Sequence, residues 1–352
     1  MFVIGLGTAV PATQYTQAQC WEALRASCQF PRLTSAARAL LERVLLGDNG
    51  IRTRHLAIGS LEQAFDIDPD SLHARFAQHA PALATEAAVE ALQRAGIEAR
   101  EIDALLISTC TGYLCPGLTS YVGEALGVRG DVLALDLVGQ GCGAALPNLR
   151  AAEALVASGR CSRVLSICVE VCSAALYIDN DPGVLVSGCL FGDGAAAAVL
   201  SGAPGTEMRC VKWHSGHSWT DPAERDALRM EQRDGMLRNV LSRQVPALAA
   251  EHAKALLEQA LQQQELGRHD VRTWIWHAGG RLVLERLRHR LELDQPDVQR
   301  SADVLSRFGN LSSAFVLFVL RRALEERAPA GWWWMSSFGA GFSCHGALLS
   351  VQ

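Results

Sequence analysis

The sequence lacks a large excess of positive or negative charge, a long apolar run and an N-terminal segment that resembles a signal peptide. Only 20% of its 352 residues are charged, and 32 Lys+Arg against 37 Asp+Glu give a formal net charge of −5. A chain this apolar does not stay disordered, and its mild acidity argues against the basic stripe of a nucleic-acid-binding protein. No uncharged apolar run approaches the ~18 residues of a membrane span. The start, Met1–Gly7, has no basic n-region and is typical of a strand, not of a signal peptide.

Disulfide and zinc-site patterns are also missing, although the chain has 11 cysteines. The number is odd, no C-x-x-C occurs, and Cys110/Cys115 and Cys168/Cys172 do not have common zinc-site spacings. Most of these cysteines lie in apolar segments, where a free thiol packs as a small hydrophobe. We therefore expect a reducing, cytoplasmic location, no disulfide framework and no metal.

The chain has no low-complexity linker, charge block or short repeat, and its apolar segments alternate between helix and strand patterns. Helices are predicted at 84–95, 118–126, 144–157, 245–264, 281–291 and 312–325. Strands are predicted at 105–108, 132–137, 163–169, 207–213, 273–277 and 332–336. Strands that are apolar on both faces and alternate with helices indicate an α/β protein whose sheet is covered on both sides.

The pattern divides the chain into two α/β halves, 1–205 and 206–352. Since no composition shift separates them, we expect the halves to share a core. The tract Trp332–Trp334 is predicted to lie in a core or subunit-contact strand, and a ligand-stacking platform is the alternative.

A glycine-rich turn brings one cysteine to the start of a helix. In DLVGQGCGAA (136–145), a buried strand runs into a turn in which Gly141 and Gly143 allow close backbone approach to Cys142. A thiol at a helix N-terminus is favoured as thiolate, its reactive form, so a lowered pKa is expected. The alternative for a Gly-Cys-Gly alone is a small buried residue at a tight turn.

Two later glycine-containing turns carry a histidine and an asparagine. His277 lies in WIWHAGG (274–280) and Asn310 in RFGNLSSA (307–314). Considered on its own, His277 would be interpreted as a structural residue and Asn310 as the N-cap of a helix. In a two-sided α/β sheet, however, sites form at the carboxyl ends of strands, where all three side chains could converge. A Cys–His pair makes an activated nucleophile, and an amide with an imidazole can hold an oxyanion, each donor lowering the barrier by about 3–4 kcal/mol.

These segments resemble the type III polyketide synthases, the chalcone synthase-like group of the thiolase superfamily. The resemblance covers essentially the whole chain and is closer to bacterial than to plant members. Besides the two turns above, the motifs are VIGLGTAVP (3–11), GQGCGAALPNL (139–149), LFGDGAAA (190–197) and SFGAGFS (337–343). The resemblance implies a thiolase-like fold, with two similar α/β halves sharing a five-layered αβαβα core, and a homodimer.

The family also implies an iterative reaction. Cys142 takes the starter from acyl-CoA and holds the growing chain, and His277 keeps that thiol ionised. His277 and Asn310 polarise the malonyl-CoA carbonyl, and the enolate left by decarboxylation attacks the Cys142 thioester. Cyclisation then gives a pyrone, resorcinol or phloroglucinol-type product. CoA supplies the activation, so no metal or organic cofactor is implied.

Several cavity positions follow from the same resemblance. Phe191 matches an aromatic gatekeeper, with core packing as its alternative, and Ser312 matches a residue near the nucleophile. Asn239 aligns with a second gatekeeper that is Phe in plant members. Two cavity walls are implied: Cys172, Ala174 and Ala175 form one, and Cys110, Thr111 and Cys115 form the other, near the dimer contact.

Departures from the plant pattern concern the substrate. Small side chains at these positions open volume or redirect a tunnel, so we hypothesise a medium or long aliphatic acyl starter and an alkylpyrone or alkylresorcinol product. For the CoA phosphates, Arg38 and Arg43 are candidates, with a solvated helix face as the alternative. Leu41 and Asp48 lie where cations are expected.

Three other functions are compatible with parts of this pattern. A β-ketoacyl-ACP synthase III has the same fold and the same Cys-His-Asn order but condenses once, in fatty-acid synthesis. A 3-hydroxy-3-methylglutaryl-CoA synthase needs a catalytic Glu that the sequence does not reveal. A non-catalytic member of the fold would have lost Cys142, His277 or Asn310, and all three are present.

Overall fold

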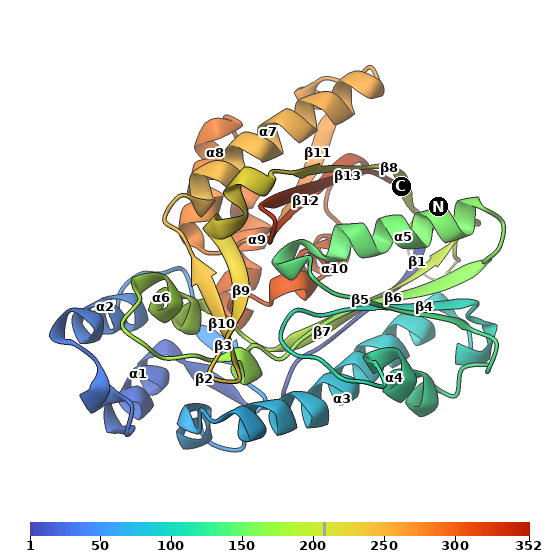
Figure 1. The fold of residues 1–352 in the computed structure, drawn as a ribbon. Coiled ribbons are helices and arrows are strands. Elements are labelled where there is room, and N and C mark those ends of the chain that lie inside the picture. The colour runs from blue at the N-terminus through green and yellow to red at the C-terminus, as the bar shows by residue number, and fades with distance from the viewer. Residues whose placement is uncertain (207–208) are drawn as a thin grey trace.

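One mixed sheet runs through the whole protein in the computed structural model, which describes residues 1–206 and 209–352 (Figure 1). Within these residues the sheet has nine strands in the order β11-β12-β13-β8-β1-β7-β6-β4-β5. Their bounds in chain order are β1 (Phe2–Ala9), β4 (Ala104–Ser108), β5 (Leu133–Leu137), β6 (Arg163–Glu170), β7 (Gly194–Ser201), β8 (Val211–Thr220), β11 (Val271–Trp276), β12 (Gly331–Gly339) and β13 (Ser343–Val351). The two predicted halves meet where β1 pairs with β8, at Phe2↔Lys212 and Val3↔Val211.

The sheet folds over a central layer of helices, which gives five layers (Figure 1). Helices α5 (Ala145–Ala157) and α10 (Phe315–Glu325) lie between the two parts of the sheet and contact strands of both. Helices α7 (Val245–Gln263) and α8 (Arg281–Arg290) lie beyond β8 and β11–β13, and α3 (Pro69–Ala95) and α4 (Leu118–Leu126) lie beyond β4–β7. The predicted five-layered αβαβα core is therefore confirmed.

Small apolar residues bring helix α3 close to the sheet. Asp68 caps its first turn through the backbone N–H of Ser71, and Gly96 ends it in the left-handed conformation. Between these ends, Ala84, Ala87 and Ala91 are fully buried against β1 and β7. No helix in the described ranges is long and apolar enough to cross a membrane.

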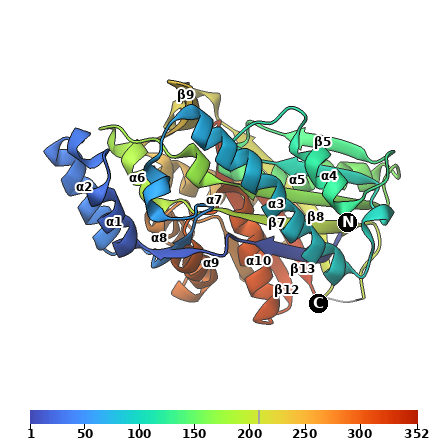
Figure 2. The same cartoon turned by 90° about the horizontal axis from the view of Figure 1, so that it is seen from below.

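A helical hairpin, α1 (Gln17–Ala26) and α2 (Ser35–Leu46), lies at one end of the molecule beside α6 (Pro182–Leu190), as Figure 2 shows. The apolar faces of these three helices form a core of their own, built around Trp21, Leu41 and Leu185. Two short sheets complete this end: β2 (Gln14–Thr16) with β3 (Thr53–His55), and β9 (Leu228–Arg233) with β10 (Met236–Leu241). Helix α9 (Gln295–Phe308) packs against α8 and α10.

The predicted elements exist, with two informative differences. Strand β5 was expected to be buried, but it is exposed along most of its length, because it is an edge strand that pairs only with β4. The helix predicted at 312–325 begins with a short 3-10 turn, Ser312–Ala314, and the helix predicted at 144–157 begins at Ala145, after a separate 3-10 turn, Gly141–Gly143. The tract Trp332–Trp334 lies in β12 with Trp333 and Trp334 fully buried, as expected of a core strand. Of the strand predicted at 207–213, residues 207–208 lie outside the described ranges.

Candidate active site

Three neighbouring parallel strands end at the same edge of the sheet, beside Cys142. Strand β4 pairs in parallel with both β5 and β6, so their carboxyl ends lie together. Cys110 follows β4, Cys142 follows β5, and Glu170 is the last residue of β6. This edge is where an α/β sheet places its ligands.

The Gly-Cys-Gly turn is packed tightly against the loop between β12 and β13. A Cβ on Gly141 would lie 3.0 Å from the backbone N of Ala340, and one on Gly143 would lie 3.1 Å from the N of Gly339. Gly141 also has a φ of 56°, which a side chain disfavours. These glycines let the SFGAGFS segment approach the buried Cys142 closely.

The turns that carry His277 and Asn310 are joined by a hydrogen bond. His277 follows β11, and its backbone N–H donates to Ser336 of the parallel strand β12 at 2.9 Å. Asn310 Nδ2 donates to the carbonyl of Gly279, two residues beyond His277, at 3.3 Å. Both side chains are buried, and Nδ1 of His277 has no hydrogen-bond partner among the residues that the structure describes.

Ser312 links Asn310 to Cys142. Asn310 Oδ1 accepts from the backbone N–H of Ser312 at 2.9 Å, and Ser312 Oγ lies 3.3 Å from Cys142 Sγ. Cys142 and Asn310, far apart in the sequence, thus both contact Ser312, and Asn310 is hydrogen-bonded to the turn that follows His277. In the described residues, no hydrogen bond joins the Cys142 thiol directly to the His277 imidazole.

Glu170 is a member of this centre that sequence reasoning missed. Its carboxylate is fully buried and accepts from Ser312 Oγ at 3.2 Å and from Thr111 Oγ1 at 3.0 Å. The sequence does contain a signal, since one acidic residue closes the otherwise apolar segment VLSICVE (164–170). A buried charge of this kind needs polar partners, and its position at a strand end indicates a site.

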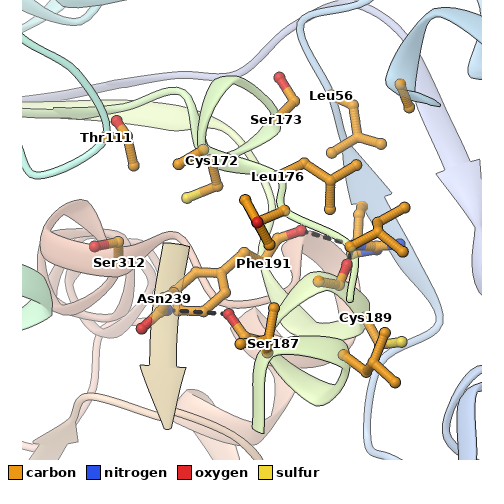
Figure 3. Close-up of a pocket in the computed structure, with 18 of the residues that line it drawn as sticks. Leu56, Thr111, Cys172, Ser173, Leu176, Ser187, Cys189, Phe191, Asn239 and Ser312 are labelled. Carbon is orange, nitrogen blue, oxygen red and sulfur yellow. Dashed lines mark hydrogen bonds between the residues drawn. The ribbon is translucent and has the colours of Figure 1, made fainter. Parts of the chain in front are cut away.

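An apolar cavity extends from Cys142 (Figure 3). Phe191 and Asn239 lie side by side on its wall, and Asn239 Nδ2 donates to Ser187 Oγ of α6 at 3.0 Å. Phe191 is fixed by an isolated bridge in which Gly192 N–H donates to the Asn310 carbonyl at 3.0 Å. The predicted residues that line the cavity are Cys110, Thr111, Cys142, Cys172, Ala175, Phe191, Asn239 and Ser312.

Other predicted site residues lie elsewhere. Ala174 was expected in the cavity wall, but it packs in the core under α3, because it follows Cys172 in a 3-10 turn (Cys172–Ala175) that sends its side chain the other way. Cys115 is exposed and does not line the cavity of the single chain. Arg38 donates to the carbonyls of Phe30 and Pro31, and Arg43 is exposed on α2; neither reaches the cavity.

Comparisons with known proteins agree with this geometry. Residues 35–263 match the family model of the FAE1/type III polyketide synthase-like proteins, and residues 222–351 match the chalcone and stilbene synthase C-terminal domain. The chain is 34% identical to a 1,3,6,8-tetrahydroxynaphthalene synthase of Streptomyces peucetius subsp. caesius, over 99% of this chain and 92% of that protein. The chain belongs to the type III polyketide synthases.

Two further relatives of this synthase support the assignment. A 3,5-dihydroxyphenylacetyl-CoA synthase of Streptomyces toyocaensis is 29% identical over 99% of this chain and 89% of that protein. The crystal structure of the 1,3,6,8-tetrahydroxynaphthalene synthase of Streptomyces coelicolor A3(2) superposes with a TM-score of 0.88, at 26% identity over 100% of this chain and 99% of that chain. The synthase therefore has the thiolase-type fold and is an acyltransferase.

Burial shifts the pKa values of Cys142 and His277 in the synthase. It raises the pKa of the Cys142 thiol to about 12 and lowers the pKa of the His277 imidazole to about 3. The predicted low thiol pKa is therefore contradicted, because the loss of solvent outweighs the favourable helix terminus. Burial thus favours the neutral form of both groups.

Proposed function

We propose that this synthase loads an acyl starter from acyl-CoA onto Cys142 and extends it by repeated decarboxylative Claisen condensation with malonyl-CoA. Cyclisation would then release a pyrone, resorcinol or phloroglucinol-type product. The observation that carries the proposal is the contact of Ser312 with both Cys142 and Asn310, with the turn after His277 hydrogen-bonded to Asn310. Cys142 and Ser312 also line a largely apolar cavity.

The chemistry of the loaded enzyme follows from these groups. The thiol sulfur attacks the thioester carbonyl of the starter, and CoA leaves. Loss of CO₂ from malonyl-CoA puts negative charge on the thioester oxygen, where the second N–H of the Asn310 amide and an imidazole N–H of His277 can donate. The enolate carbon then attacks the acyl group on Cys142. The CoA thioesters supply the activation, so we propose no metal or organic cofactor.

An apolar arm of the cavity supports an aliphatic starter. This arm lies between α1, α2 and α6 and is lined by Leu24, Leu41, Leu45, Leu185 and Cys189, which are all buried. An alkyl tail in such an arm gains about 0.8 kcal/mol for each CH₂ removed from water. An aromatic starter or a short one would leave the arm unfilled.

The names of the relatives favour a second candidate, a polyhydroxylated aromatic product. One experiment separates the two: product mass spectrometry with labelled malonyl-CoA, alone and with a panel of acyl-CoAs of roughly C8–C16 or coumaroyl-CoA. We expect alkylpyrones or alkylresorcinols from the long acyl-CoAs. An aromatic product from malonyl-CoA alone, or a preference for coumaroyl-CoA, contradicts the aliphatic starter.

Narrowing the arm should shorten the preferred starter. Cys189→Phe places a ring in the space between α2 and α6, so we expect loading of a C16 starter to fall about tenfold or more relative to a C8 starter. Cys189→Ala, which removes bulk at the same position, should keep the wild-type order of preference. Competition between two acyl-CoAs, with acylated protein counted by mass spectrometry, measures the ratio. An unchanged ratio in Cys189→Phe would mean that the tail does not enter this arm.

We further propose a homodimer that covers the exposed edge around β5. Leu133 and Leu135 are 41% and 37% exposed there, and Val138 beyond the strand is 60% exposed. An edge strand with uncovered apolar side chains is a ready pairing surface. Leu135→Glu combined with Val138→Asp should yield a monomer in light scattering, whereas Leu282→Glu, at an apolar residue 63% exposed on α8, should not. A dimer that survives the double substitution refutes this surface.

A further inference from the structure

Arg54 is a buried cation that lines the cavity. It comes from the short strand β3 and is 5% exposed. Among the residues that the structure describes, its guanidinium forms no ion pair with a carboxylate. Arg238, which is almost as buried, is instead held by Asp179, Asp181 and Glu231 at 2.9, 3.3 and 2.8 Å. Since a buried cation needs polar partners, a ligand in the cavity is the expected partner of Arg54.

Only one side of the Arg54 guanidinium is hydrogen-bonded within the described residues. Its Nη1 donates to the carbonyls of Gly188 at 2.8 Å and Phe191 at 2.9 Å. Its Nε is buried without a partner, and no described residue accepts from its Nη2. Nε and Nη2 form the edge with which an arginine binds two oxygens at once, as Arg290 does with Glu251 at 2.7 and 2.8 Å.

The surroundings fix the position of the Arg54 side chain. Besides the two carbonyls, its stem packs against Gly309: a Cβ on this residue would lie 3.0 Å from Cγ and 3.2 Å from Cδ of Arg54. Gly309 also has a φ of 72°, which suits glycine, and it directly precedes Asn310. The guanidinium is therefore preorganised, and a ligand that binds it does not have to order a mobile side chain.

Arg54 lies where the cavity wall at Phe191 meets the apolar arm. The two carbonyls that it binds, those of Gly188 and Phe191, flank Cys189, which lines the arm. Cys189 and Phe191 lie at the end of α6, and Figure 3 shows Phe191 on the wall beside Asn239. An acyl chain that runs past Phe191 into the arm therefore comes next to Arg54.

An alkyl starter has no oxygen that could accept from this guanidinium, but the growing chain acquires such oxygens. Each condensation adds two carbons and one ketone at the thioester end and moves the older carbons towards the arm. With the second condensation the chain contains a β-diketone, whose two oxygens can lie in one plane. Arginine is the residue whose planar donor edge matches a planar pair of oxygens.

We propose that Arg54 binds the β-diketone that the acyl chain acquires with its second extension. Nε and Nη2 donate to the two ketone oxygens, and the alkyl tail lies in the arm beyond them. The diketone thereby satisfies buried N–H groups and holds the extended chain for cyclisation or a further extension. Arg54 contacts no reacting atom and is a specificity-determining residue. The inference rests on the proposed extension of an acyl chain on Cys142.

Binding of free ketones tests this site without a CoA thioester. By isothermal titration calorimetry, we expect the wild type to bind an alkyl β-diketone about tenfold or more tightly than a monoketone of the same length. Arg54→Lys and Arg54→Gln keep a donor for a backbone carbonyl but lack the two-donor edge, so the preference should fall to about threefold or less. Arg209 is the matched control, since it donates to the carbonyls of Ala328 and Gln352 and does not line the cavity. Arg209→Lys should keep the wild-type preference.

Product analysis tests the same site during the reaction. In Arg54→Lys, acylation of Cys142 in a single turnover should stay within about threefold of the wild-type rate, because the starter carries no ketone. The ratio of chains released after one extension to products of two or more extensions should rise about tenfold or more. Mass spectrometry with labelled malonyl-CoA measures this ratio. A substitution that merely disturbed the fold would lower acylation as well.

The inference is overturned if the wild type binds both ketones equally, or if Arg54→Lys and Arg54→Gln keep the wild-type preference. It is also overturned if a carboxylic acid of the same length binds more tightly than the β-diketone and loses this advantage in Arg54→Lys, because the edge then serves another ligand. Ketone binding does not depend on catalysis. A wild type that prefers the β-diketone but forms no polyketide would refute the proposed function and leave the binding site standing.

Discussion

Cys142→Ala abolishes acyl loading and chain extension and leaves the decarboxylation of malonyl-CoA. Cys142 is the cavity thiol on the Gly-Cys-Gly turn and is the proposed site of the acyl thioester, so we expect product formation to fall by more than about 10³-fold. Decarboxylation depends instead on the donors His277 and Asn310 and should continue within about threefold of the wild-type rate. Product mass spectrometry and release of labelled CO₂ measure the two activities on the same sample.

A second cysteine provides the matched control for this prediction. Cys161 is buried just before the amino end of β6, whereas Cys142 follows the carboxyl end of β5, and both strands run parallel to β4. Cys161 does not line the cavity. Cys161→Ala makes the same chemical change and should keep both activities. Product formation by Cys142→Ala near the wild-type rate would show that another nucleophile holds the chain. Loss of CO₂ release along with the product would show that the substitution damaged the whole site.

The three residues proposed to react could be selected from the sequence because each lies in a local pattern. Cys142 and His277 each follow a strand in a glycine-containing turn, and such turns lie at the carboxyl ends of strands. Asn310 lies in a glycine-containing turn as well, but this turn follows helix α9. Ser312 was predicted near the nucleophile, but its bridging position was not, since its partners Cys142 and Glu170 are 170 and 142 residues away. Contacts over such separations are created by the sheet order, which no local pattern contains.

Burial was the property that the sequence predicted least well. The helix terminus at Cys142 is a local feature and was recognised, but the desolvation that raises its pKa depends on the loop at 339–341 packed against it. The same holds for β5, whose leucines are exposed on an edge strand whose outer side pairs with no strand of the described residues. The leucines of α1 and α2 have the spacing of ordinary core residues. The apolar arm of the cavity forms where α6 packs against these two helices, and the spacing of the leucines does not predict that packing.

Asn310→Asp should remove the decarboxylation step while preserving the turn. The Oδ1 atom that accepts from the Ser312 N–H remains, but the amide that donates to Gly279 and can donate to the oxyanion becomes an acceptor-only carboxylate. Losing one such donor costs about 10²–10³ in rate, so CO₂ release and extension should both fall by that factor. Single-turnover loading of Cys142 from acyl-CoA should change by less than about tenfold, because attack on the starter does not require the enolate.

Asn49, which lies outside the site, is a matched control for this substitution. Its Oδ1 accepts from the backbone N–H of Ile51, and its Nδ2 donates to the backbone carbonyl of Val44. Asn49→Asp should leave both activities unchanged, and wild-type CO₂ release by Asn310→Asp would remove Asn310 from the oxyanion site.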